Sequence, residues 1–121
     1  MRKDLAKKYI DLAAGEARGK YISAGIGQDA VYALKSAQAR DYRQRNYEGN
    51  VPVFVQVEAS VMEMTPMQAA DSIIATEEAW LNIAGHIERL RRTAKIQIDL
   101  LDEETEVAQF CEYVLTEFKK I

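Results

Sequence analysis

An apolar residue recurs at every seventh position through the second half of the chain, and further apolar residues fill the steps of three and four between them. The set consists of Ile73, Trp80, Ile83, Ile87, Leu90, Ala94 and Leu101. Residues spaced in this way share one side of an α-helix. The pattern predicts a long amphipathic helix with Trp80 in the middle of a core seam, which packs against its own bundle or against symmetry mates.

The start of this long helix has a clear local signal. Thr65 is a good N-cap, Pro66 suits the first helical position, and Gln68 can complete a capping box. A helix over about 66–101 would be about 54 Å long, whereas a compact domain of this size spans about 35 Å. The sequence therefore predicts an elongated bundle, or a free helix end that packs on another subunit. Gly85 leaves a kink as a third possibility, because glycine costs about 1 kcal/mol in a helix interior.

Two helices are predicted in the first 47 residues, and one is predicted after the long helix. Leu5, Tyr9 and Leu12 begin an apolar stripe that indicates a helix over about 4–22, and a second stripe indicates one over about 28–47. Acidic residues crowd positions 102–106, where they suit the first turn of a new helix better than the end of the preceding one. The final helix is predicted at about 103–119.

Residues 50–64 are ambiguous, because Val53, Val55 and Val57 alternate like a strand while other apolar residues step like a helix. We favour a helix over about 51–63. Asn50 is a good N-cap and Pro52 is tolerated in a first turn, whereas a lone strand would find no second strand in the chain.

Size and composition fit one all-α domain, residues 1–121, built as an elongated bundle of four or five helices. Hydrophobic residues make up 48% of the chain and charged residues 29%, which is typical of a folded protein. The net charge of −3 argues against general binding to nucleic acid or anionic membranes, which requires a basic surface. No run of residues predicts a signal peptide or a membrane-spanning helix.

The residue types that carry most catalysis are scarce. His86 is the only histidine and Cys111 the only cysteine, so zinc sites with two histidines and intrachain disulfides are excluded. We expect no enzymatic activity, no catalytic or metal-binding residues and no cofactor.

Four cations follow one another on the long helix and are candidates for contact with a partner: Arg89, Arg91, Arg92 and Lys95. They can bind phosphate, but Glu88 can pair with Arg92 and Asp99 with Lys95, which favours a self-paired solvated face. An acidic cluster, residues 99–106, comes directly after the basic turn. Staggered or antiparallel neighbouring helices can use this separation of charge.

Several blocks of the sequence resemble small helical proteins encoded in the tail-gene region of tailed bacteriophages. The main block is residues 65–74, followed by Trp80, Ile87, Arg91 and Lys95. Earlier blocks that look like the same family are residues 18–22, then Tyr32, Lys35 and Gln38, and residues 47–52.

The resemblance implies a virion accessory protein or a factor associated with tail fibres, made in the host cytoplasm and placed in the tail. Its expected partners are other fibre or baseplate proteins and further copies of itself. It carries no catalytic residues over to this chain. A tail-fibre assembly chaperone, absent from the mature virion, is the first alternative, and a small regulator that binds nucleic acid through the basic turn is the second.

Overall fold

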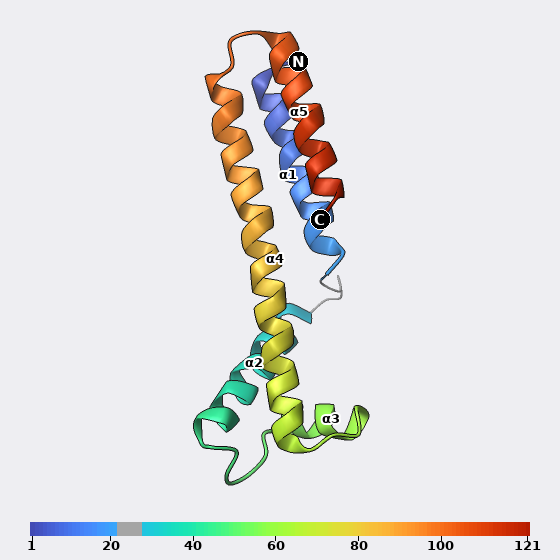
Figure 1. Ribbon diagram of the computed structural model, residues 1–121, viewed down its shortest axis with the longest axis vertical. Coiled ribbons are helices and arrows are strands. Elements are labelled where there is room, and N and C mark those ends of the chain that lie inside the picture. Colours follow the sequence, from blue (N-terminus) through green and yellow to red (C-terminus); the bar gives the residue numbers. More distant parts are fainter. Residues whose placement is uncertain (22–27) are drawn as a thin grey trace. The chain divides into compact units, whose positions relative to one another are not determined.

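The computed structural model describes residues 1–21 and 28–121. Within these residues the chain forms five helices and no strand (Figure 1): α1 (Lys3–Gly19), α2 (Gln28–Gln44), α3 (Val53–Val61), α4 (Pro66–Leu100) and α5 (Glu104–Lys119). The all-α prediction is confirmed, and the ambiguous segment is a helix. None of the described helices is long and apolar enough to cross a membrane.

The chain divides into two compact units, and α4 contributes to both. The first unit contains Met1–Ser23 and Asn82–Ile121, and the second contains Ala24–Leu81. Each unit has its own hydrophobic core. The assignment of all 121 residues to one domain stays a prediction.

The first unit is a bundle of α1, α5 and the second part of α4. Its α1 and α5 run parallel. The N-terminal amine donates to the Glu104 carbonyl where both helices begin, and Lys20 Nζ donates to the Lys119 carbonyl where both helices end. The α4 segment runs antiparallel to both (Figure 1). The buried residues are Ala6, Ile10, Ala14, Ala17, Ile87, Ala94, Ile98, Val107, Cys111, Val114 and Phe118.

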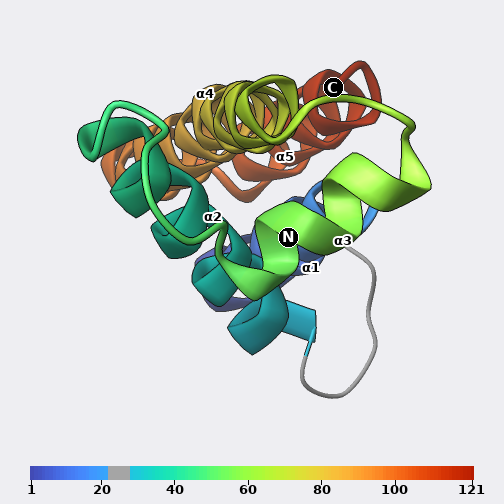
Figure 2. The ribbon, with the colours of Figure 1, turned by 90° about the horizontal axis from the view of Figure 1, so that it is seen from below.

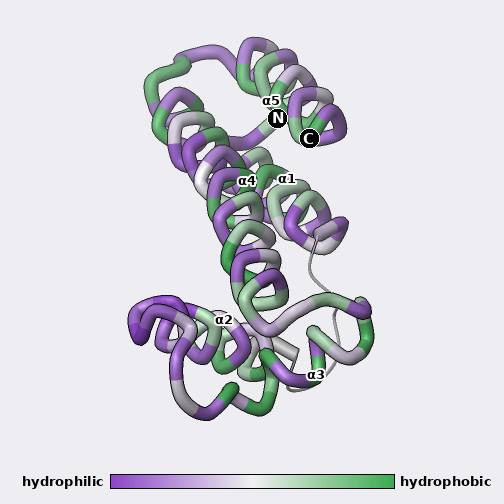
Figure 3. The backbone as a smooth tube through the Cα atoms, turned by 60° about the horizontal axis from the view of Figure 1, so that its bottom comes forward, coloured by the Kyte–Doolittle hydropathy of each residue, from purple (hydrophilic) through white to green (hydrophobic). Residues whose placement is uncertain are grey.

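The second unit packs α2 and α3 against the first part of α4 (Figure 2). Its core is smaller and consists of Ala39, Tyr42, Val55, Ala69, Ala70, Ile73 and Ile74. Figure 3 shows hydrophobic and hydrophilic residues alternating along the helices. Amphipathic helices of this kind bury one stripe and leave the other side to water.

The start of α4 has the geometry of the predicted capping box. The Gln68 amide N–H donates to Thr65 Oγ1 over 3.2 Å, and the Thr65 amide N–H donates to Gln68 Oε1 over 3.0 Å. Two amide groups that the first helical turn leaves unsatisfied thereby find acceptors.

Helix α2 begins at Gln28 and α5 ends at Lys119, as predicted, but several other ends differ. Helix α2 ends at Gln44 rather than near residue 47, because Asn46 and Tyr47 adopt positive φ angles of 57° and 58° and the Tyr47 amide N–H donates to the Tyr42 carbonyl. Pro52 occupies the N-cap position of α3 without a side-chain hydrogen bond, so the predicted Asn50 cap is not formed. Helix α1 ends at Gly19, with Lys20 in the C-cap position, rather than near residue 22.

Helix α4 includes Gly85 and is assigned as one helix from Pro66 to Leu100. A Cβ built on Gly85 meets no atom within 4 Å. Gly15 inside α1 has the same open surroundings.

We therefore expect Gly85→Ala to raise the free energy of unfolding by about 1 kcal/mol, because alanine loses less backbone entropy on folding. Urea titration followed by circular dichroism measures this change. Gly15→Ala is the matched comparison and should stabilise by a similar amount. A loss of stability in Gly85→Ala alone would mean that the glycine has a packing role at that site.

The burial of α1 gives a second prediction. Ile10 is completely buried, whereas Leu12 on the same helix is 57% exposed. Ile10→Ala should lower the free energy of unfolding by about 2–5 kcal/mol, and Leu12→Ala should cost clearly less because little apolar surface leaves water there. Equal losses in the two variants, measured by thermal or urea unfolding, would contradict the assigned core of the first unit.

Candidate interaction surfaces

The predicted seam of α4 divides between the two cores. Ile87 and Ala94 are buried in the first unit, with Ile83, Leu90 and Leu101 partly buried against them. Ile73 is buried in the second unit.

Trp80, the predicted middle of the seam, is partly buried on α4. Its place in a core stays a prediction. Each half of α4 also buries a residue that the heptad pattern leaves out, Ile98 in one unit and Ile74 in the other. The apolar positions of the two halves follow different registers because different helices cover them.

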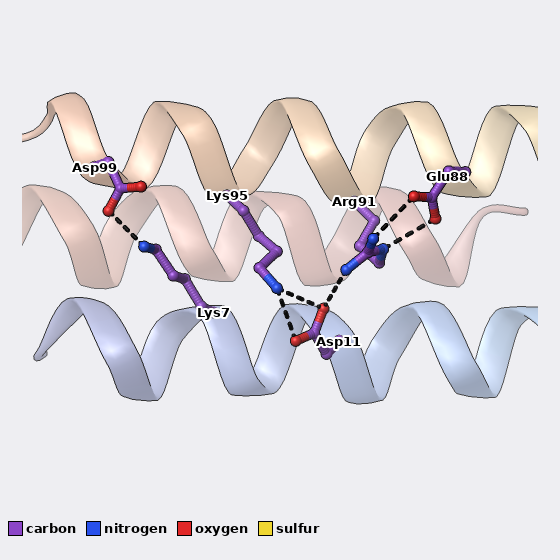
Figure 4. A network of polar contacts seen from close by, with 6 residues as sticks. All are labelled: Lys7, Asp11, Glu88, Arg91, Lys95 and Asp99. Carbon is purple, nitrogen blue, oxygen red and sulfur yellow. Dashed lines mark hydrogen bonds and ion pairs between the residues drawn. The ribbon is translucent and has the colours of Figure 1, made fainter.

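Two of the four predicted partner-contacting cations are used inside the first unit (Figure 4). Arg91 Nη1 lies 2.9 Å from Asp11 Oδ1, and Lys95 Nζ lies 2.9 Å from Asp11 Oδ2, so both bind one carboxylate of α1. Arg91 also pairs with Glu88 over 2.8 Å. Asp99 pairs with Lys7. Glu88 therefore pairs with Arg91 of its own helix instead of Arg92, and Asp99 and Lys95 pair with residues of α1 instead of with one another.

The cations of α4 lower the pKa of Asp11. The hydrogen bond from Lys95 is the largest cause, and the hydrogen bond from Arg91 adds to it, while partial burial acts in the opposite direction. All three side chains are partly exposed, so solvent screens the pairs and each contributes modestly to stability. Their main effect is to set how α1 and α4 align.

Arg89 and Arg92, the other two predicted cations, are exposed and form no ion pair with any described residue. They lie on the opposite side of α4 from the buried Ile87, Ala94 and Ile98. These two side chains are free to contact a partner.

A polar network in the second unit was not predicted from the sequence. Asp71 of α4 accepts hydrogen bonds from Tyr47 Oη over 2.6 Å and from Arg43 Nη2 over 2.8 Å, and both contacts lower its pKa, that of Tyr47 most. Arg40 of α2 pairs with Glu77 of α4. The arginines of α2 show in the sequence that ion pairs can form, but their partners are about 30 residues away. The rule that pairs charges three or four residues apart on one helix cannot find partners at that distance.

Helix α3 carries an exposed apolar row. Val53, Val57 and Val61 are spaced four residues apart and are 58%, 52% and 70% exposed. The one charged residue of the helix, Glu58, is paired with Lys35 over 2.7 Å. The row, which we call the valine row, is therefore an apolar surface without an unpaired charge on its own helix.

The single histidine and cysteine lie apart from any cluster of polar groups. His86 is exposed on α4. Cys111 is buried, and burial raises the pKa of its thiol, which disfavours the reactive thiolate. In the described part of the chain, no group of three or more histidine, cysteine, aspartate or glutamate residues is placed to hold a metal ion.

Comparison of the chain with protein-family models, with curated proteins and with solved structures finds no match.

The Asp11 network predicts a pH dependence of stability. Because the folded pKa of Asp11 is below its unfolded value, the contact stabilises the fold above the ordinary aspartate pKa of about 3.9 and is lost as the pH falls through the folded value. The melting temperature should fall as the medium is acidified, and less steeply in Asp11→Asn. Glu16→Gln removes an exposed carboxylate of α1 that has no described ion pair and is the control. Identical slopes in Asp11→Asn and the native protein would contradict the prediction.

Proposed function

We propose that this chain is a non-enzymatic virion protein of a tailed bacteriophage, an adaptor or accessory component of the tail linked to fibres or baseplate. It would be made in the host cytoplasm and would then reside in the tail. The resemblance of residues 65–74 and of the earlier blocks to tail-region proteins supports this assignment. It acts through surfaces and uses no cofactor.

The valine row is the observation that carries the interaction role. Apolar side chains exposed singly are normal on protein surfaces, but a contiguous apolar row is typical of a surface that a partner covers. Met62 directly follows the row in the sequence and is exposed, and Met67 in the first turn of α4 is also exposed. Methionine side chains adapt to different partner shapes because they are unbranched and flexible.

The assembly chaperone remains the second candidate, and the same methionines favour it. A chaperone covers apolar surface on an unfinished fibre and then leaves, so it benefits from an adaptable contact surface. A regulator that binds nucleic acid has weaker support, because Arg91 and Lys95 are already bound to Asp11. Retention on DNA that weakens with salt would favour that third candidate.

The deciding measurement is mass spectrometry of purified infectious particles. We expect tryptic peptides of this chain at an abundance comparable with known tail proteins. Absence from the particles, with the protein abundant in the lysate, would contradict the virion assignment and favour the chaperone.

A variant pair tests the valine row in the same particles. Val57→Asp places a charge in the row and should remove the protein from particles, because an unpaired charge resists burial in an interface. Thr116→Asp adds the same charge at an exposed position of α5, a different helix, and should be incorporated normally. Equal incorporation of both folded variants would show that the row is not the contact surface.

A further inference from the structure

The outer face of α4 in the first unit changes along its length from basic to apolar residues. Arg89 and Arg92 form its basic end, and Ile96 and Leu100 form an apolar centre in which they are 59% and 68% exposed. We call these four residues the outer α4 face. Their spacing of three and four residues places them on one side of the helix, away from the core.

Acidic residues follow this face in the turn between α4 and α5. Asp102 and Glu103 are exposed and form no ion pair with any described residue. The surface is thus basic at one end, apolar in the centre and acidic at the other end. The uncharged and exposed Thr93 and Gln97 lie on one side of Ile96, and on its other side the charge of Asp99 is paired with Lys7.

We propose that the outer α4 face binds the same face of a second copy of this chain in an antiparallel arrangement. Arg89 precedes Ile96 by seven residues and Glu103 follows it by seven. A two-fold axis near Ile96 therefore brings the basic end of each copy to the acidic turn of the other. Parallel copies would place arginine against arginine and carboxylate against carboxylate, which is unfavourable.

Charge complementarity selects a second copy over an unrelated partner. An isologous contact requires a surface that complements itself, and a basic end opposite an acidic end around an apolar centre meets that requirement. The valine row has no charges that could orient a partner, so it lacks this self-complementary arrangement of charge. The face spans only a few helical turns, so it buries less than the roughly 800 Å² per partner of a standard stable interface. We therefore expect a weak dimer that also weakens as salt screens the charges.

Sedimentation equilibrium of the full chain over about 1 µM to about 1 mM, the range of weak affinities, tests the dimer. We expect a monomer–dimer equilibrium in that range. Ile96→Ser should weaken dimerisation by at least about tenfold because it removes the apolar centre. Leu12→Ser changes an equally exposed apolar residue on α1 and should leave the equilibrium unchanged. A chain that is monomeric throughout would overturn the proposal.

Two charge-reversal variants test the antiparallel arrangement. Arg89→Glu with Arg92→Glu makes the face wholly acidic, and Asp102→Lys with Glu103→Lys makes it wholly basic. Each variant alone should dimerise at least about tenfold more weakly, whereas a mixture of the two should form a heterodimer, because every contact then joins opposite charges. All four positions are exposed, and circular dichroism checks that both variants fold.

A matched control changes the same amount of charge elsewhere. Lys8→Glu with Lys119→Glu alters two exposed lysines outside the face and should leave the dimer unchanged. Unaltered dimerisation in both face variants, or no gain on mixing them, would overturn the proposal. The inference does not rest on the phage assignment, so a monomeric chain found in virions would disprove the dimer and leave the proposed function standing.

Discussion

Burial of the apolar side of α4 is the constraint on which the rest of the structure depends. A helix of 35 residues gains most of its stability from packing and little from intrinsic propensity. One pair of helices covers its first part and another pair covers its second part. Each unit therefore has a core of three helices, and a change in the residues that α4 buries would remove the surface on which the other two pack.

Contacts between helices then fix how the elements align within each unit. Asp11 binds two cations one turn apart on α4, which sets the register of α1 against α4. In the second unit, Asp71 of α4 accepts hydrogen bonds from Arg43 and Tyr47 at the end of α2, and these bonds align α2 with α4.

The helices and the capping box at Thr65 were predictable because they depend on neighbours within four residues along the chain. The end of α2 was less predictable, because it depends on two residues with positive φ. One of them is a tyrosine, and tyrosine rarely adopts that conformation. Heptad spacing left out the buried Ile74 and Ile98, because the spacing assumes one partner along the whole helix. Asp11, which binds both Arg91 and Lys95, lies 80 and 84 residues away from them, so local charge rules could not identify it.

The positions of the only cysteine and the only tryptophan give each unit its own natural reporter. Cys111 lies in the core of the first unit, so a thiol reagent reaches it only when that core opens. Trp80 belongs to the second unit, and its fluorescence follows the environment of that part of α4. Because one helix runs through both units, comparing the two signals during unfolding tells whether α4 couples the cores into a single cooperative transition or lets one core melt before the other.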